Sequence, residues 1–134
     1  MKVIGLFVAE NVIIDQRTNK LSLVNVFENL ESEGFPLFIP GLNLVLLGER
    51  DPADADGIPI HFAVSLGGRA LLEAEGRVLF QPGVKRARCI LTVGGLVVPE
   101  PGTLEFTASI SGVPVASTIS EVALRSSVAA LPQT

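Results

Sequence analysis

The sequence lacks most of the side chains on which binding and catalytic sites are commonly built. Its 134 residues contain no Trp, no Tyr, one His and one Cys. Sites for sugars, single-stranded nucleic acid or methylated cations use the faces of Trp and Tyr rings, so we do not expect these ligand classes. One His and one Cys cannot supply the four ligands of a tetrahedral zinc site within one chain. The single cysteine, Cys89, also excludes an internal disulfide bond, which fits a reducing compartment.

Charged residues are scarce as well. They make up 18% of the sequence, where soluble domains average about 25%, whereas hydrophobic residues make up 48%. This composition leaves little polar surface to cover a monomer, and exposed apolar patches commonly mark interfaces. We therefore expect a homo-oligomer or a complex with a protein partner. The net charge is −4, and the only dense basic stretch is Lys85, Arg86 and Arg88, so nucleic acid is not an expected partner.

Long apolar runs are missing too. No window approaches the roughly 18–20 apolar residues that a membrane-spanning helix requires. The apolar run over residues 3–8 is followed by Glu10 and lacks a small-residue cleavage site, so it is a poor signal peptide. These absences predict a protein with no membrane span and a cytoplasmic location.

The features that are present are those of β-strands. Short apolar segments, several of them alternating with period two, follow one another between turn residues from Lys2 to Val128. The predicted strands cover residues 3–14, 21–27, 42–47, 58–66, 69–77, 86–91, 104–110 and 113–119. A chain of this length forms one domain and buries about two-thirds of its unfolded surface. The sequence therefore predicts an antiparallel β-sandwich of about eight strands over residues 1–128, with a tail at 129–134.

Three details of this prediction can be checked against a structure. Residues 28–34 are acidic and are expected to form a loop. Residues 35–40 begin with Phe35-Pro36 and end at a proline, so they cannot form a central strand, because proline donates no ladder hydrogen bond. Ser111-Gly112 is expected to be the two-residue turn of a hairpin whose inner face carries Val113, Val115 and Ile119, with a β-bulge beyond Ser120.

Several of these segments resemble a family of short uncharacterised bacterial all-β proteins. The resemblance rests on the opening strand, on residues 20–27 (KLSLVNVF), on Phe35-Pro36, and on residues 101–106 (PGTLEF) leading to Gly112. It covers nearly the whole chain and implies an immunoglobulin-like sandwich. It implies no activity and supplies no catalytic residues.

The few candidate reactive groups do not form a catalytic set in the sequence. His61 lies on the outward face of its predicted strand and Cys89 on the inward face of its own, so strand alternation keeps the two apart. No G-x-S-x-G motif is present. Glu73 and Glu75 share a strand face, and we expect them to form a cross-strand charge ladder with Arg69, Arg77, Arg86 and Arg88. No catalytic residue and no cofactor is therefore predicted.

The favoured interpretation is a non-catalytic interaction or structural module that self-associates. The interface is expected in the hairpin over residues 3–27 and in residues 35–40, with Phe7, Phe35 and Phe38 as its side chains. One alternative is a calcium- or lipid-surface-binding domain that uses the loop acids Asp51, Asp54 and Asp56, although their spacing does not fit an EF-hand. A second alternative is an enzyme whose site forms between subunits around His61.

Overall fold

Segments with period-two alternation have one apolar face each, and in the computed structural model of this chain those faces pack against one another. The structure describes residues 1–125, which form strands and no helix. The strands are β1 (Lys2–Ile14), β2 (Leu21–Val26), β3 (Asn29–Ser32), β4 (Leu37–Ile39), β5 (Leu42–Glu49), β6 (Gly57–Leu66), β7 (Arg69–Leu79), β8 (Arg86–Val93), β9 (Leu96–Val98), β10 (Gly102–Ile110) and β11 (Val113–Leu124). The all-β class is thus confirmed, and the expected tail at 129–134 lies outside the described residues.

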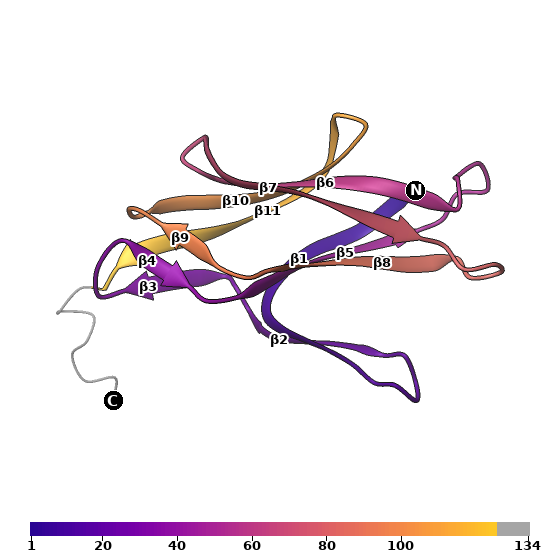
Figure 1. The fold of residues 1–134 in the computed structure, drawn as a ribbon, viewed down its shortest axis with the longest axis horizontal. Helices are drawn as coiled ribbons and strands as arrows, with labels where there is room; N and C mark the ends of the chain where they lie inside the picture. Colours follow the sequence, from indigo (N-terminus) through magenta and orange to yellow (C-terminus); the bar gives the residue numbers. More distant parts are fainter. Residues whose placement is uncertain (126–134) are drawn as a thin grey trace.

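Two sheets form the layers of the fold (Figure 1). The first has the order β2-β1-β5-β8 and the second has the order β3-β11-β10-β6-β7. A two-stranded ribbon of β4 and β9 lies at one end of the molecule. All pairings are antiparallel except that of β3 with β11. No helix long and apolar enough to cross a membrane occurs in the described part of the chain.

The core consists of the inward residues of both sheets. Phe62 of β6 and Phe106 of β10 are its largest fully buried side chains, and Val64 pairs directly with Phe106 across the two strands. The first sheet supplies Leu42, Leu44 and Leu46 from the same face of β5. Every second residue of a strand points to the same face, and the buried residues of β6 and β10 follow this alternation, whereas β5 also buries Val45 on its other face.

The hairpin of β1 and β2 leaves the sandwich. β1 pairs with β5 up to Ala9 and pairs with β2 from there to Ile14. Beyond Ala9 the hairpin extends below the first sheet, on the side away from the second sheet (Figure 1). We call residues 10–26 the hairpin arm. Its tip returns to the first sheet, where Arg88 Nη2 of β8 donates to the carbonyl oxygen of Asn19 at 2.8 Å and to its side-chain Oδ1 at 2.7 Å.

The prediction of a loop over residues 28–34 is wrong for the residues of β3, which pair in parallel with the end of β11. Backbone hydrogen bonds hold this pairing, and beyond it Arg125 N donates to the Ser32 carbonyl at 2.7 Å. The buried side-chain hydroxyl of Ser120 donates to the Phe27 carbonyl just before β3, at 2.9 Å. An edge strand stabilised mainly by main-chain hydrogen bonds needs no apolar alternation, so its sequence resembles that of a loop. The short strand β9 also escaped the sequence prediction.

The closing hairpin turns at Ser111-Gly112 as predicted, but its bulge lies elsewhere. Both turn residues have positive φ, as a type I′ turn requires. The register then shifts at Val115, because Ala108 faces Ala116 while Ser109 faces Pro114. The bulge therefore comes near the start of β11 instead of beyond Ser120, and the proline beside it donates no hydrogen bond. In consequence Ile119, which was expected to face inward, pairs with Glu105 on the outward face and is exposed. Val113 pairs with Ile110 next to the turn and is exposed at that end of the hairpin.

Gly76 in β7 lies where a side chain would collide with the core. A Cβ built there would stand 2.7 Å from Cys89 Sγ and 3.1 Å from Phe62 Cε2. We expect Gly76→Ala to lower the free energy of unfolding by about 1–3 kcal/mol, since the packed neighbours must move to admit the methyl group. Gly94→Ala is the control, because a Cβ at Gly94 meets nothing within 4 Å. Urea unfolding curves with the same midpoint for both variants would contradict this prediction.

Candidate functional sites

His61 lies at the centre of a polar row on the outward face of the second sheet. Its neighbour across the β6–β10 pairing is Ser109, and its neighbour across the β6–β7 pairing is Glu75. The ring Nδ1 lies 2.7 Å from Glu75 Oε1, and Nε2 lies 3.3 Å from Glu73 Oε1. The hydrogen bond with Glu75, followed by that with Glu73, raises the pKa of His61 above its usual value, although partial desolvation opposes the shift.

These contacts correct the predicted charge ladder. Glu73 and Glu75 pair with His61, whereas Arg69 lies 3.6 Å from Glu100 and Arg88 bonds to the hairpin arm. The hydrogen-bonded neighbour of β7 is β6, because the chain crosses to the other sheet before β8 begins. Residues of β7 and β8 therefore do not face each other across one ladder, and the expected row of alternating charges does not form.

The polar row borders a shallow pocket of about 500 Å³. Its lining residues are Pro59, His61, Glu75, Ser109, Ser111 and Gly112. A hydroxyl nucleophile needs a base within hydrogen-bonding reach, and here both ring nitrogens of His61 face carboxylates. Sequence reasoning did not single out Ser109 and Ser111, because only the strand register decides which residues stand opposite His61.

Cys89 points inward as the alternation predicted. Its side chain is buried in the core, where desolvation raises the pKa of the thiol, and a backbone hydrogen bond from Arg77 opposes that shift. A thiol in such surroundings is a small hydrophobic side chain with little thiolate character. The predicted separation of Cys89 from outward-facing His61 is thus confirmed.

The acidic loop directs its carboxylates to different cations of the chain. The N-terminal ammonium lies 3.0 Å from Asp51 Oδ2 and 3.0 Å from Asp54 Oδ2. Arg50 Nη2 bonds to Asp56 Oδ1 at 2.8 Å, with its guanidinium 5.2 Å from the centre of the Phe80 ring. The backbone N–H of Asp51, followed by the ammonium, lowers the pKa of Asp54. Among residues 1–125, no three His, Cys, Asp or Glu side chains gather closely enough to hold a metal ion.

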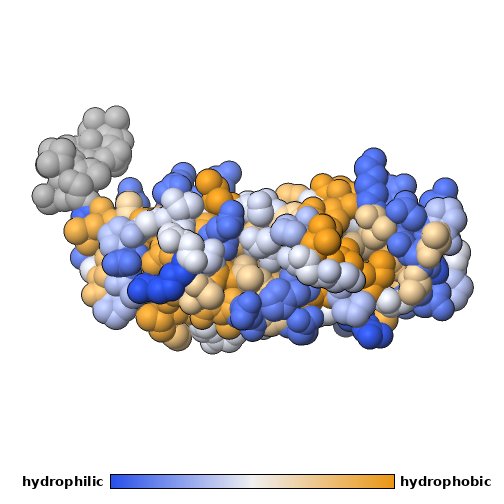
Figure 2. Space-filling model, turned by 90° about the horizontal axis from the view of Figure 1, so that it is seen from above, coloured by the Kyte–Doolittle hydropathy of each residue, from blue (hydrophilic) through white to orange (hydrophobic). Residues whose placement is uncertain are grey.

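The three phenylalanines predicted at an interface differ in exposure. Phe38 of β4 is 60% exposed and pairs with Val97 of β9, which is 52% exposed. Phe7 is partly exposed on the first sheet, on the face away from the core. Phe35 is half-buried and packs against the core cluster, so it is the least available of the three. Apolar areas separated by hydrophilic side chains are also visible on the face shown in Figure 2.

A second pocket, of about 250 Å³, lies beside Phe38. It is lined by Glu10, Phe27, Leu30, Glu31, Leu37, Phe38, Ile39, Pro40 and Gly41. We call this surface, together with Val97, the ribbon patch. It joins an exposed aromatic ring to two carboxylates contributed by β1 and β3, which only the folded chain brings together.

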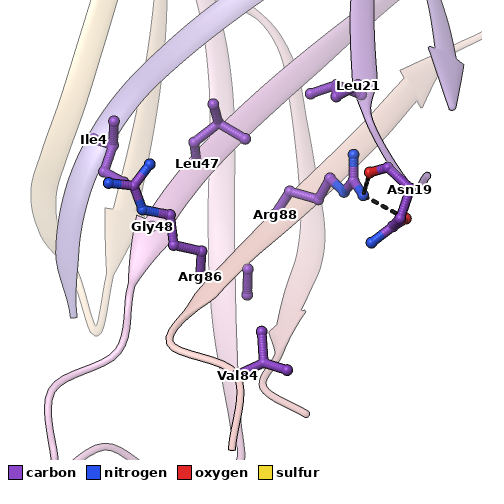
Figure 3. A pocket seen from close by; sticks show the side chains of 9 residues that line it. Ile4, Asn19, Leu21, Leu47, Gly48, Val84, Arg86 and Arg88 are labelled. Carbon is purple, nitrogen blue, oxygen red and sulfur yellow. Dashed lines mark hydrogen bonds between the residues drawn. The ribbon is translucent and has the colours of Figure 1, made fainter. Parts of the chain in front are cut away.

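A third pocket lies between the hairpin arm and the first sheet (Figure 3). This arm groove has a volume of about 460 Å³ and is lined by Ile4, Asn19, Leu21, Leu47, Gly48, Val84, Arg86, Ala87 and Arg88. Arg88 anchors the tip of the arm, whereas Arg86 is 74% exposed and its nearest carboxylate, Glu49, lies 3.9 Å away. The sequence showed these arginines as a basic stretch but did not predict the groove. The groove forms because the hairpin arm bends back toward β8.

Residues 5–123 match a family described as a family of unknown function (DUF6941). The chain belongs to this family. The match covers nearly all of the sandwich and includes the hairpin arm and both strands of the ribbon. No curated protein matches the chain closely enough to count as a relative. Membership in this family assigns no activity to the chain.

The two glutamates should control the titration of His61. We expect Glu75→Gln to lower the pKa of His61 toward its ordinary value, and NMR titration of the imidazole protons measures it. Because the folded-state pKa is raised, the contact stabilises the protein below the unfolded pKa of about 6.5, and this contribution disappears as pH rises through the folded pKa. Glu105→Gln, on another strand, is the control, and an equal pKa in both variants would refute the assignment.

The contacts of the acidic loop predict that calcium does not bind there. A cation would have to displace the N-terminal ammonium from Asp54 and Arg50 from Asp56. We therefore expect no heat in calorimetric titration with calcium and no change in Tm. A saturable heat that disappears in Asp54→Asn would contradict this expectation and establish the calcium-binding alternative.

Proposed function

We propose that this protein is a non-catalytic β-sandwich module that acts through its surfaces and self-associates, alone or as a subunit of a larger assembly. The observation that carries the proposal is the exposed pair of Phe38 and Val97 at one end of the molecule. Ile39, Leu96 and Val98 of the same two-stranded ribbon are buried, so the ribbon is held firmly while Phe38 and Val97 stay in water. A contiguous apolar surface of this kind is typical of an interface.

The position of the polar groups supports a role without catalysis. His61 lies in an open pocket on a sheet face with both ring nitrogens beside carboxylates, and the only thiol is buried in the core. An acid–base or nucleophilic site normally places such groups within reach of each other in a cleft that excludes water. A cytoplasmic location belongs to the same proposal and is supported by the single cysteine, which allows no internal disulfide bond.

We further propose that the sandwich is immunoglobulin-like. Its main strands in chain order are β1, β5, β6, β7, β8, β10 and β11, which correspond to strands A, B, C, C′, E, F and G. The orders β1-β5-β8 and β11-β10-β6-β7 then match the A-B-E and G-F-C-C′ sheets of such domains. The hairpin arm and the short strands β3, β4 and β9 are additions to this frame.

The alternative function is an enzyme whose site is shared between subunits. It requires His61 to lie at a contact between copies. If His61→Ala leaves both the oligomeric state and every assayed activity unchanged, this alternative loses its only histidine base.

Replacing Phe38 by Asp should weaken self-association. We expect Phe38→Asp to raise the dissociation constant of the oligomer at least about tenfold, since exposed aromatic residues commonly dominate interface energy. Size-exclusion chromatography with light scattering over a range of concentrations measures the change. The control is Val113→Asp, because Val113 is 61% exposed at the turn between β10 and β11. A monomeric parent protein at every concentration would refute the proposal.

A further inference from the structure

We propose that copies of this chain associate head to tail, with the ribbon patch of one copy docked in the arm groove of the next. This inference rests on the proposed self-association and specifies its surfaces. It is drawn from the charges that border the two apolar surfaces and from their positions in the fold.

The ribbon patch is an apolar surface with an acidic border. Phe38 and Leu37 share it with Glu10 and Glu31, and its lining among the described residues includes no basic side chain. Neither carboxylate is fully engaged within its own chain. Glu10 Oε2 accepts one hydrogen bond from Asn25 at 3.1 Å, and exposed Glu31 lies 3.6 Å from exposed Arg125. Because an ionised carboxylate can accept about four hydrogen bonds, both can receive further donors.

The arm groove has the complementary composition. Ile4, Leu21, Leu47 and Val84 supply apolar surface, and Arg86 and Arg88 supply positive charge, with no acidic residue in the described lining. Arg88 uses only one terminal nitrogen on Asn19, and Arg86 makes one long contact at 3.9 Å. Each guanidinium has five N–H donors, so both retain donors for a carboxylate from another molecule.

The two surfaces lie at opposite ends of the molecule. Figure 1 shows β4 and β9 at one end, and the loop before β8 and the tip of the hairpin arm toward the other. Contact between two ribbon patches would bring Glu10 and Glu31 against the same residues of the partner, and contact between two grooves would bring arginines together. Both arrangements are repulsive. Only the pairing of patch with groove joins opposite charges and covers both apolar surfaces.

Such a contact uses two different surfaces of each copy. Unlike a two-fold dimer, a contact of this type leaves one patch and one groove free at the ends of every open assembly. It therefore continues into a ring if the rotation between copies closes, or into an open chain if it does not. The assembly should grow with concentration instead of stopping at a dimer, unless a ring closes.

The test is a charge exchange between the two surfaces, measured by sedimentation velocity of the full chain over a concentration series. Arg86→Glu and Glu31→Lys should each weaken association about tenfold or more, as close charge pairs at interfaces commonly do. An equimolar mixture of the two variants should restore the parent distribution, because each copy then meets a complementary partner at both ends. The double variant Arg86→Glu/Glu31→Lys should also associate by itself.

Matched controls carry the same charge changes outside both surfaces. They are Arg69→Glu, at the start of β7, and Glu105→Lys, on β10. Circular dichroism and Tm establish that each variant is folded. If either charge reversal destabilises the fold, the neutral changes Arg86→Gln and Glu31→Gln should still weaken association relative to Arg69→Gln and Glu105→Gln.

The possible outcomes separate this inference from the proposed function. Head-to-tail docking is wrong if Arg86→Glu associates as tightly as Arg69→Glu, or if the mixture of variants stays dissociated. If Phe38→Asp weakens association while Arg86→Glu does not, the result supports self-association and refutes only the head-to-tail geometry. A parent protein that stays monomeric at every concentration refutes both.

Discussion

The burial of Phe62 and Phe106 between the two sheets is the interaction on which the other features of this molecule depend. Both rings come from adjacent strands of the second sheet and pack in a core completed by Leu42, Leu44 and Leu46 of the first. Removing such apolar surface from water is the dominant favourable contribution to folding. Because β6 and β10 are held in this register, His61 must stand between Ser109 and Glu75, and β7 must lie beside β6. The polar row on the outside is therefore a consequence of the packing inside.

The two surfaces proposed to bind other copies of the chain lie where it departs from the sandwich. The hairpin arm leaves the first sheet after Ala9 and is tied back to it by the contact of Arg88 with Asn19. The ribbon of β4 and β9 closes one end of the core with its buried residues and exposes Phe38 and Val97. Each addition creates an apolar surface bordered by charges of one sign. Exposed apolar side chains also occur outside these two surfaces, for example Leu79, Val113 and Ile119.

The charges also illustrate how far a sequence pattern can mislead. Glu73, Glu75 and the arginines that follow them lie close in sequence and predicted a ladder, but the chain crosses between sheets within that interval. Glu73 and Glu75, which were expected to pair with arginines, instead contact the imidazole of His61. Arg86 lines the arm groove. The acidic loop is a second example. Asp54 pairs with the N-terminal ammonium and Asp56 pairs with the guanidinium of Arg50, and no local sequence pattern predicted either contact.

Period-two alternation was enough to predict the all-β class, the positions of the long strands, the turn at Ser111-Gly112, the inward Cys89 and the outward His61, because these depend on neighbouring residues of one strand. The local sequence did not predict the parallel edge strand β3, the bulge at Val115 or the partners of His61. It also did not predict either of the two charged apolar surfaces. These depend on which strands become neighbours, and that choice is made by packing the whole core. Contacts between residues distant in the chain therefore determine which side chains meet at each candidate site. The local order of side chains determines the strands on which those residues lie.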